Sequence, residues 1–235
     1  YVTGAAPMAL DTIEKLKKVR NVPLINVYGL TEITPMGTAT PWGGMEKPET
    51  VGVPLPSTDL RIVDLDTGKM ELKIGEIGEI CFKGPQVMTG YYKRPEETAL
   101  VMEDGWLKTG DVGFMDEDGY VTIVDRKKDV INASGFNVYP KEIDELLITH
   151  PKILEVCTIG VPDTYRGETV KVFIVTKPGQ TMTTEEVIDF CKEKLAGYKV
   201  PKLVEFIAAL PKSVVGKVLR RELRDMEAKN KEGKS

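Results

Sequence analysis

The chain has 235 residues, of which 41% are hydrophobic and 29% are charged, and its formal net charge at pH 7 is −4. This balance is typical of a soluble globular protein with one or two cores, and the negative charge argues against nucleic acid as a partner. No run of about 18 apolar residues predicts a transmembrane helix, and three widely spaced cysteines (Cys81, Cys157, Cys191) argue against a disulfide framework or a zinc site and favour the cytoplasm.

The first region, about residues 1–47, contains a helix signal and a buried strand signal. The helix is expected over Leu10–Val19, and the apolar run VPLINVYGL, residues 22–30, predicts a strand. That strand would deliver the segment YGLTE, residues 28–32, to a loop. Before the helix, TGAAP at residues 3–7 indicates a turn of small residues that would let backbone pass close to a flat ligand; a plain loop is the alternative.

The YGLTE segment carries side chains that suit a magnesium nucleotide. Tyr28 offers a ring that can stack on a base, and Gly29 lets the backbone approach a ligand closely. Thr31 offers a hydroxyl to a phosphate oxygen, and Glu32 offers the hard carboxylate oxygen that Mg²⁺ prefers. A plain strand-to-loop turn is the alternative for this pentapeptide taken alone.

The second region, about residues 48–124, consists of short strand signals separated by turn residues. Three alternating or apolar runs are RIVDLDTGK (61–69), GEIGEICFKG (75–84) and FMDEDGYVTIV (114–124). They predict a compact barrel or sandwich. Asp111 follows a glycine in KTGDVG, where its side chain can project and accept both hydroxyls of a ribose. An Asx turn on its own backbone is the alternative.

The segment DRKKD, residues 125–129, places five charges in a row between two strand-like runs. This pattern argues against a buried strand and indicates a surface turn or an interdomain hinge. Arg126 is a second candidate for a ribose contact, and Lys128 is the candidate point at which the backbone turns. A solvated charge run is the alternative.

The third region, residues 130–235, alternates between helix and strand signals. Helices are expected over Lys141–Thr149 and Thr183–Lys194, the second with a capping box from Thr183 to Glu186. Strands are expected at residues 153–162, 170–177 and 203–210. This order predicts a small α+β domain.

Two further positions in this region are candidates for chemistry. Gly135, in NASGFNVYP, lies between a strand and a helix, where an extended ligand can run along backbone; a structural glycine is the alternative. Lys217, in PKSVVGKVLRREL, lies on a turn, where its charge could neutralise a carboxylate and an α-phosphate during attack. Taken alone, Lys217 reads as a surface lysine.

The set of motifs resembles the adenylate-forming superfamily of acyl-CoA synthetases, luciferases and peptide-synthetase adenylation domains. The motifs, in order, are GAAP, YGLTE, GEIGEICFKGPQVMTGYYKRPEETA, DGWLKTGD, DRKKDVINASGFNVYP and PKSVVGKVLRREL. The resemblance covers essentially the whole chain. Within it, GPQVMTGYYKRPEET, IVDRKKD, SGFNVYP and GYKVPKLVEF are similar to long-chain fatty acid–CoA ligases of bacteria and archaea.

The resemblance implies a mixed α/β and α+β fold in four parts. Residues 1–47 would end the large nucleotide-binding domain, 48–124 would form a β-barrel-like subdomain, 125–129 a hinge, and 130–235 a small mobile C-terminal domain. It also implies ATP with Mg²⁺ and CoA as the small molecules bound. The acid would first become an acyl-adenylate, and the CoA thiol would then displace AMP.

Residue roles follow from the same resemblance. Adenine would be lined by Gly4, Ala5, Ala6 and Pro7 and stacked by Tyr28, next to Gly29. Thr31 would contact the α-phosphate, and Glu32 would bind Mg²⁺. Ribose would be held by Asp111 and Arg126, and Lys217 would stabilise the adenylation transition state. Rotation about Lys128 would exchange Lys217 for the Gly135 segment, which would line the pantetheine tunnel.

The sequence also departs from the family pattern. The Ser/Thr/Gly-rich loop that grips the β- and γ-phosphates is absent, as is most of the acyl pocket, so the resemblance implies the C-terminal portion of a ligase that cannot turn over alone. Asn137 stands where some relatives have an arginine. Two other functions stay open, an adenylation domain that loads a carrier protein and a nucleotide- or partner-binding module without chemistry. Peripheral contact with the inner membrane is also open, and oligomeric state is not readable.

Overall fold

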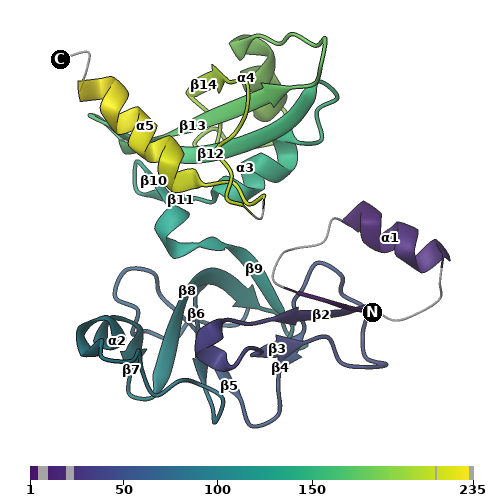
Figure 1. Cartoon of the computed structure of the whole chain (residues 1–235), viewed down its shortest axis with the longest axis vertical. Helices are drawn as coiled ribbons and strands as arrows, with labels where there is room; N and C mark the ends of the chain where they lie inside the picture. The colour runs from purple at the N-terminus through teal and green to yellow at the C-terminus, as the bar shows by residue number, and fades with distance from the viewer. Residues whose placement is uncertain (5–9, 20–23, 215, 233–235) are drawn as a thin grey trace. The chain divides into compact units, whose positions relative to one another are not determined.

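The computed structural model describes residues 1–4, 10–19, 24–214 and 216–232, which form two compact units. The first unit is Tyr1–Lys127 and the second is Lys128–Ser235. The boundary lies next to Lys128, the expected hinge residue, although motion about it stays a prediction. The mixed α/β and α+β fold class is confirmed (Figure 1).

The N-terminal part of the first unit is a small four-stranded sheet in the order β1-β2-β3-β4. Strand β1 (Val2–Thr3) runs parallel to β2 (Ile25–Tyr28), and helix α1 (Leu10–Val19) lies between them in the chain. Strands β3 (Thr38–Ala39) and β4 (Val53–Pro54) add antiparallel. The helix has the expected bounds, and β2 is the expected strand before YGLTE. The 3-10 helix η1 (Thr31–Ile33) then begins inside that segment.

A second sheet of five antiparallel strands makes up most of this unit. Its order is β5-β6-β8-β7, and β9 pairs with the edge of β8 opposite β6, because Gly113 is paired with both Gly78 and Ile123. The expected barrel or sandwich is therefore an open, curled sheet (Figure 1). Its elements are β5 (Asp59–Val63), β6 (Gly78–Lys83), α2 (Pro95–Val101), β7 (Met102–Glu103), β8 (Trp106–Met115) and β9 (Val121–Arg126).

The expectation that DRKKD holds no buried strand was wrong for its first residues. Asp125 and Arg126 are the last residues of β9, and Asp125 is buried; only the remainder turns, as the 3-10 helix η2 (Lys127–Asp129). Asp129 is also buried, and its carboxylate accepts a hydrogen bond from Arg224 at 2.7 Å. The two buried carboxylates have hydrogen-bond partners, since the Arg126 amide donates to Asp125 and Arg224 donates to Asp129.

The second unit is a five-stranded sheet with helices on both faces. Along β13, Val170, Val172 and Ile174 join the core that includes α3 and α4, whereas Phe173 and Val175 join the core that includes α5. Side chains alternate between the faces of a strand, so an apolar run such as VKVFIVTK supplies both cores. The strands are β10 (Ile131–Ala133), β11 (Phe136–Val138), β12 (Ile153–Asp163), β13 (Gly167–Thr176) and β14 (Leu203–Phe206).

The helices of this unit follow the sequence closely. Helix α3 (Pro140–Leu147) ends two residues before the expected end, and α4 (Thr184–Lys192) has the expected capping box at Thr183 and Glu186. The last helix, α5 (Arg220–Glu232), carries the charge-dense tail. All three cysteines are free and buried. Among the described helices, none is long and apolar enough to cross a membrane.

Candidate functional site

Three of the expected nucleotide-binding side chains meet in the first unit. The Tyr28 hydroxyl donates to Asp111 Oδ2 at 2.6 Å, and Arg126 Nε lies 3.6 Å from Asp111 Oδ1. Asp111 on β8 and Arg126 on β9 are paired in register, and Tyr28 reaches Asp111 from the end of β2, which belongs to the other sheet of this unit. Asp111 lies inside β8, with its carboxylate bonded to Tyr28 and paired with Arg126.

The burial of these groups sets what each can offer a ligand. Tyr28 is 9% exposed and packs on Phe82 with ring centroids 6.1 Å apart, so most of its ring is covered. Burial, reinforced by the Asp111 charge, raises the pKa of Tyr28 well above its usual range, so the phenol is a hydrogen-bond donor. The Arg126 side chain is 47% exposed. Stacking of Tyr28 on adenine stays a prediction.

Glu32 lies on η1 and is held by a residue that the sequence reasoning missed. Its Oε1 accepts from the Tyr91 hydroxyl at 2.7 Å, and this hydrogen bond raises the pKa of Tyr91. The signal in the sequence is GYYKRPEET, residues 90–98, which is part of one of the motifs that carry the resemblance. Thr31 is exposed at the start of the same turn.

The carboxylate chemistry fits Mg²⁺ delivered with a nucleotide. Within the described ranges, no group of three or more His, Cys, Asp or Glu residues could hold a metal ion. Mg²⁺ usually keeps several waters and binds through one or two carboxylates plus substrate phosphates, rather than in an all-protein cage. Glu32, partly exposed on a short turn, is a donor of that kind.

The two described glycines expected at the adenine subsite lie where other atoms of the protein pack too closely for a side chain. A Cβ on Gly29 would lie 1.6 Å from the Pro35 carbonyl oxygen, and one on Gly4 would lie 2.6 Å from Val27 Cγ2. Gly29 is thus required where the chain doubles back after β2. Three other adenine-lining candidates, Ala5, Ala6 and Pro7, lie outside the described residues.

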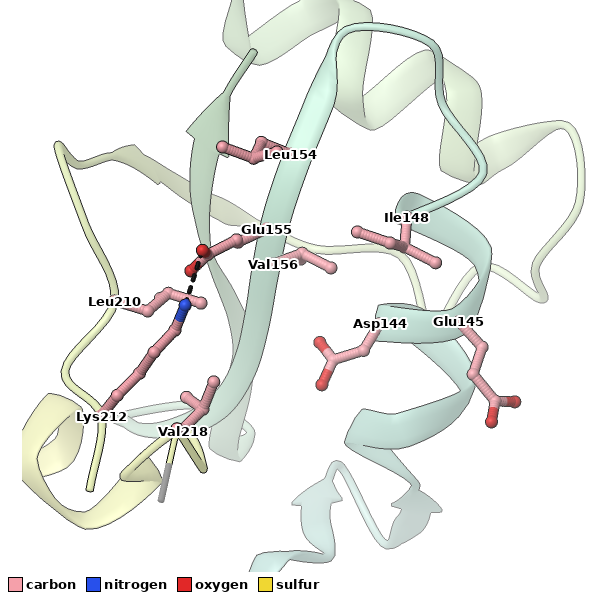
Figure 2. A pocket seen from close by; sticks show the side chains of 10 residues that line it. Asp144, Glu145, Ile148, Leu154, Glu155, Val156, Leu210, Lys212 and Val218 are labelled. Atoms are coloured by element: carbon pink, nitrogen blue, oxygen red, sulfur yellow. Dashed lines mark hydrogen bonds and ion pairs between the residues drawn. The ribbon is translucent and has the colours of Figure 1, made fainter. Parts of the chain in front are cut away.

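In the second unit, Lys217 lies on a tight turn, and its neighbour Val218 lines the pocket that Figure 2 draws. The Ser213 amide donates to the Lys217 carbonyl at 2.8 Å, and Lys212 forms an isolated antiparallel bridge with Val218. Lys212 Nζ pairs with Glu155 Oε1 on β12 at 2.6 Å, drawn as the dashed line. Beside the turn is an open hollow of about 400 Å³. Lys217 itself is exposed.

The other side of this turn is anchored by Arg220 at the start of α5. Its Nη2 donates to Asp144 Oδ2 on α3 at 2.6 Å, and the Thr158 amide donates to Asp144 Oδ1 at 2.7 Å. The lysine turn is therefore fastened to the sheet on one side and to α3 on the other. These anchoring contacts do not involve the Lys217 side chain.

Gly135 occupies a different loop of the same unit, between β10 and β11. Its φ is +84°, and nothing lies within 4 Å of a Cβ built on it. The loop borders a hollow of about 270 Å³, next to which the rings of Phe136 and Tyr198 stack at 4.7 Å. The sequence reasoning missed the other lining residues, which include Arg166, Thr169 and Lys202. Asn137 pairs with Asn132 across the two strands.

Lys128 lies between two anchored neighbours. On one side, Lys127 Nζ pairs with the buried Glu79 at 2.8 Å, which fixes it to the first unit. On the other side, Asp129 is held by Arg224 at 2.7 Å within the second unit. Lys128 is exposed. Lys128, the predicted hinge residue, thus lies between two residues whose side chains are held within different units.

Comparison with known proteins places these residues in a wider context. The sequence-family model for AMP-binding enzymes matches residues 1–92. The family model for the C-terminal domain of AMP-binding enzymes matches residues 142–217. A long-chain-fatty-acid–CoA ligase from Bacillus subtilis (strain 168) is 49% identical over 229 residues, covering 97% of this chain and 41% of the relative. This chain thus spans about two-fifths of that ligase's length.

Solved structures agree with the sequence matches. ATP-bound MatB from Rhodopseudomonas palustris superposes with a TM-score of 0.87 at 39% identity, covering 96% of this chain and 44% of that one. The o-succinylbenzoate CoA synthetase of Bacillus subtilis, in complex with ATP and magnesium, gives 0.81 at 33% identity, covering 94% and 45%.

Proposed function

This chain belongs to the AMP-binding enzyme family, and from that premise we propose that it is part of a long-chain fatty acid–CoA ligase. The acid carboxylate attacks the α-phosphorus of ATP, giving acyl-adenylate and pyrophosphate. The CoA thiol then attacks the acyl carbon, giving the thioester and AMP. The observation that carries the proposal is the meeting of Tyr28, Asp111 and Arg126 in one unit that also holds Glu32.

The first unit supplies the nucleotide contacts in this proposal. Asp111 and Arg126 hold the ribose, one as an acceptor for its hydroxyls and the other as a donor. Each carboxylate oxygen has more than one lone pair, so Asp111 can accept from a ribose while it accepts from Tyr28. Thr31 meets the α-phosphate, and Glu32 binds the Mg²⁺ that enters with ATP. Bound Mg²⁺ neutralises phosphate charge during the displacement.

The second unit supplies one loop to each half-reaction. Lys217 serves adenylation, and the Gly135 loop, with its neighbouring hollow, serves CoA. The two loops are separate elements of one rigid sheet domain, so rotation of that domain about Lys128 would exchange them. The anchored positions of Lys127 and Asp129 support this placement of the hinge.

Asp111→Asn is expected to weaken ATP binding about tenfold, because a charge-assisted hydrogen bond to the ribose becomes a neutral one. The amide oxygen can still accept from Tyr28, so the fold should persist. Calorimetric titration of ATP into the full-length gene product measures the change. The control is Asp66→Asn, an exposed aspartate of the same unit; equal affinities for the two variants would contradict the ribose assignment.

Gly135→Leu is expected to slow thioester formation by about ten- to 100-fold and to leave adenylation unchanged. The side chain would fill the open space at the loop and misplace the pantetheine chain. Single-turnover assays that start from ATP or from pre-formed acyl-adenylate separate the two steps. Gly179→Leu, at another open glycine with φ of +76°, controls for backbone strain. An equal slowing of both steps by Gly135→Leu would refute the assignment.

The proposed function is tested on the full-length gene product with ATP, Mg²⁺, CoA and acids from acetate to oleate. Formation of acyl-CoA and AMP with long acids supports it. Adenylate without thioester would favour a carrier-protein substrate, and no product with any acid would favour a binding module. We also expect the 235 residues alone to show no ATP–pyrophosphate exchange, since they span about 41% of the ligase they match.

A further inference from the structure

The segment GYYKRPEET, residues 90–98, supplies none of the proposed nucleotide or CoA contacts, yet it reaches the turn that carries Glu32. The Tyr91 hydroxyl donates to Glu32 Oε1 at 2.7 Å. The Met88 amide donates to the Glu32 carbonyl at 2.8 Å, and Thr34 Oγ1 donates to the Gln86 carbonyl at 3.0 Å. Both the backbone and the side chain of Glu32 are thus tied to residues 86–91.

Tyr91 is itself held in place by the start of α2. Its amide donates to Thr98 Oγ1 at 2.9 Å, and that hydroxyl donates to the Arg94 carbonyl at 2.7 Å. The Arg94 amide returns a hydrogen bond to the Tyr91 carbonyl at 3.1 Å. Gly90 has φ of +151°, and a Cβ on it would lie 2.8 Å from Thr98 Cγ2. Gly90, Tyr91 and Thr98 therefore form one local structural unit.

We propose that Tyr91 is a positioning residue that fixes the Glu32 carboxylate for Mg²⁺. This inference rests on the proposed function, in which Glu32 binds the magnesium of the nucleotide. A glutamate on a short turn has several rotatable bonds, and a donor bound to Oε1 restricts them while Oε2 stays available to the metal. Partners that hydrogen-bond a ligating carboxylate commonly change metal affinity by about ten- to 100-fold.

The neighbouring tyrosine offers a matched control. Tyr92 is 85% exposed and adjacent in sequence, whereas Tyr91 is 37% exposed and bonded to Glu32. Phenylalanine at either position keeps the ring and removes one hydroxyl. If the hydroxyl of Tyr91 acts on Glu32, only the first substitution should change the dependence on magnesium.

The experiment measures ATP binding by the full-length gene product, with Mg²⁺ and with EDTA, by calorimetry. Tyr91→Phe should weaken binding of ATP with Mg²⁺ by about tenfold and leave metal-free ATP binding unchanged. The Mg²⁺ concentration for half-maximal adenylation should rise by a similar factor. Tyr92→Phe should leave all three quantities unchanged. An equal effect on ATP binding with and without Mg²⁺ would overturn the proposal.

A double-mutant cycle with Glu32→Gln separates positioning from general structure. If Tyr91 acts through Glu32, Tyr91→Phe should have no further effect once Glu32 is a glutamine; additive effects would overturn the inference. If Glu32→Gln alone leaves the magnesium dependence unchanged, the assigned role of Glu32 fails first, and the two failures are thus distinguishable. Should Tyr91→Phe not fold, Thr98→Val tests the same local unit by removing the hydroxyl that holds the Tyr91 amide. An unchanged magnesium dependence in Thr98→Val would count against the proposal.

Discussion

Replacing Lys217 by alanine is expected to lower the rate of acyl-adenylate formation by about 100- to 1,000-fold. A fixed cation directed at charge that develops in the transition state commonly contributes this much. Thioester formation from pre-formed acyl-adenylate should not change, because the Gly135 loop is a separate element. ATP–pyrophosphate exchange in the full-length gene product measures the first step, and thioester release from synthetic acyl-adenylate measures the second.

The structure predicts that this loss is chemical rather than structural. The turn is held by backbone hydrogen bonds at Ser213 and by the Lys212–Glu155 pair, and Lys217 is exposed. Stability should therefore change by less than about 0.5 kcal/mol. Lys229→Ala, an exposed lysine on α5, is the matched control and should keep full exchange activity. Equal loss of both half-reactions in Lys217→Ala would refute the proposal that the Lys217 turn acts in adenylation and the Gly135 loop in thioester formation.

Replacing Gly29 by alanine is expected to destabilise the protein by more than about 4 kcal/mol, enough to prevent accumulation of folded protein. The added Cβ would lie 1.6 Å from the Pro35 carbonyl oxygen and 2.8 Å from Met36 Cα. Both neighbours are backbone atoms, which cannot move aside as a flexible side chain can. Urea unfolding and soluble yield of the full-length gene product measure the effect.

Gly135→Ala is the contrasting substitution at a predicted site glycine. Its Cβ would meet nothing within 4 Å, so the cost is the left-handed backbone alone, about 1 kcal/mol. The loss of unfolding free energy would then differ severalfold between Gly29→Ala and Gly135→Ala, although the resemblance assigns both glycines to ligand contacts. Similar unfolding free energies for the two alanine variants would show that the chain does not double back at Gly29 as described.

Local features of the fold could be predicted from the sequence. The bounds of α1, the capping box at Thr183 and Glu186, and the apolar run at residues 170–177 rest on neighbours within a few residues. Helix periodicity, capping and strand alternation are short-range properties, so the sequence carries them directly. The residue types at Glu32, Asp111 and Lys217 made these positions candidates for nucleotide chemistry, and the resemblance of the ordered motifs indicated the reaction.

Contacts between distant residues depended on the tertiary structure. Strand register decided that Asp111 faces Arg126, and the contact of Asp111 with Tyr28 joins two different sheets. Asp125 is buried at the end of β9 instead of lying in a solvated charge run. The hydrogen bond from Tyr91 to Glu32 joins residues whose pairing no local pattern encodes. The sequence by itself determined the elements and the kinds of reactive group, because those follow from near neighbours. Only the packing of strands and loops decided which groups touch, because one residue of register shift moves every side chain to the opposite face.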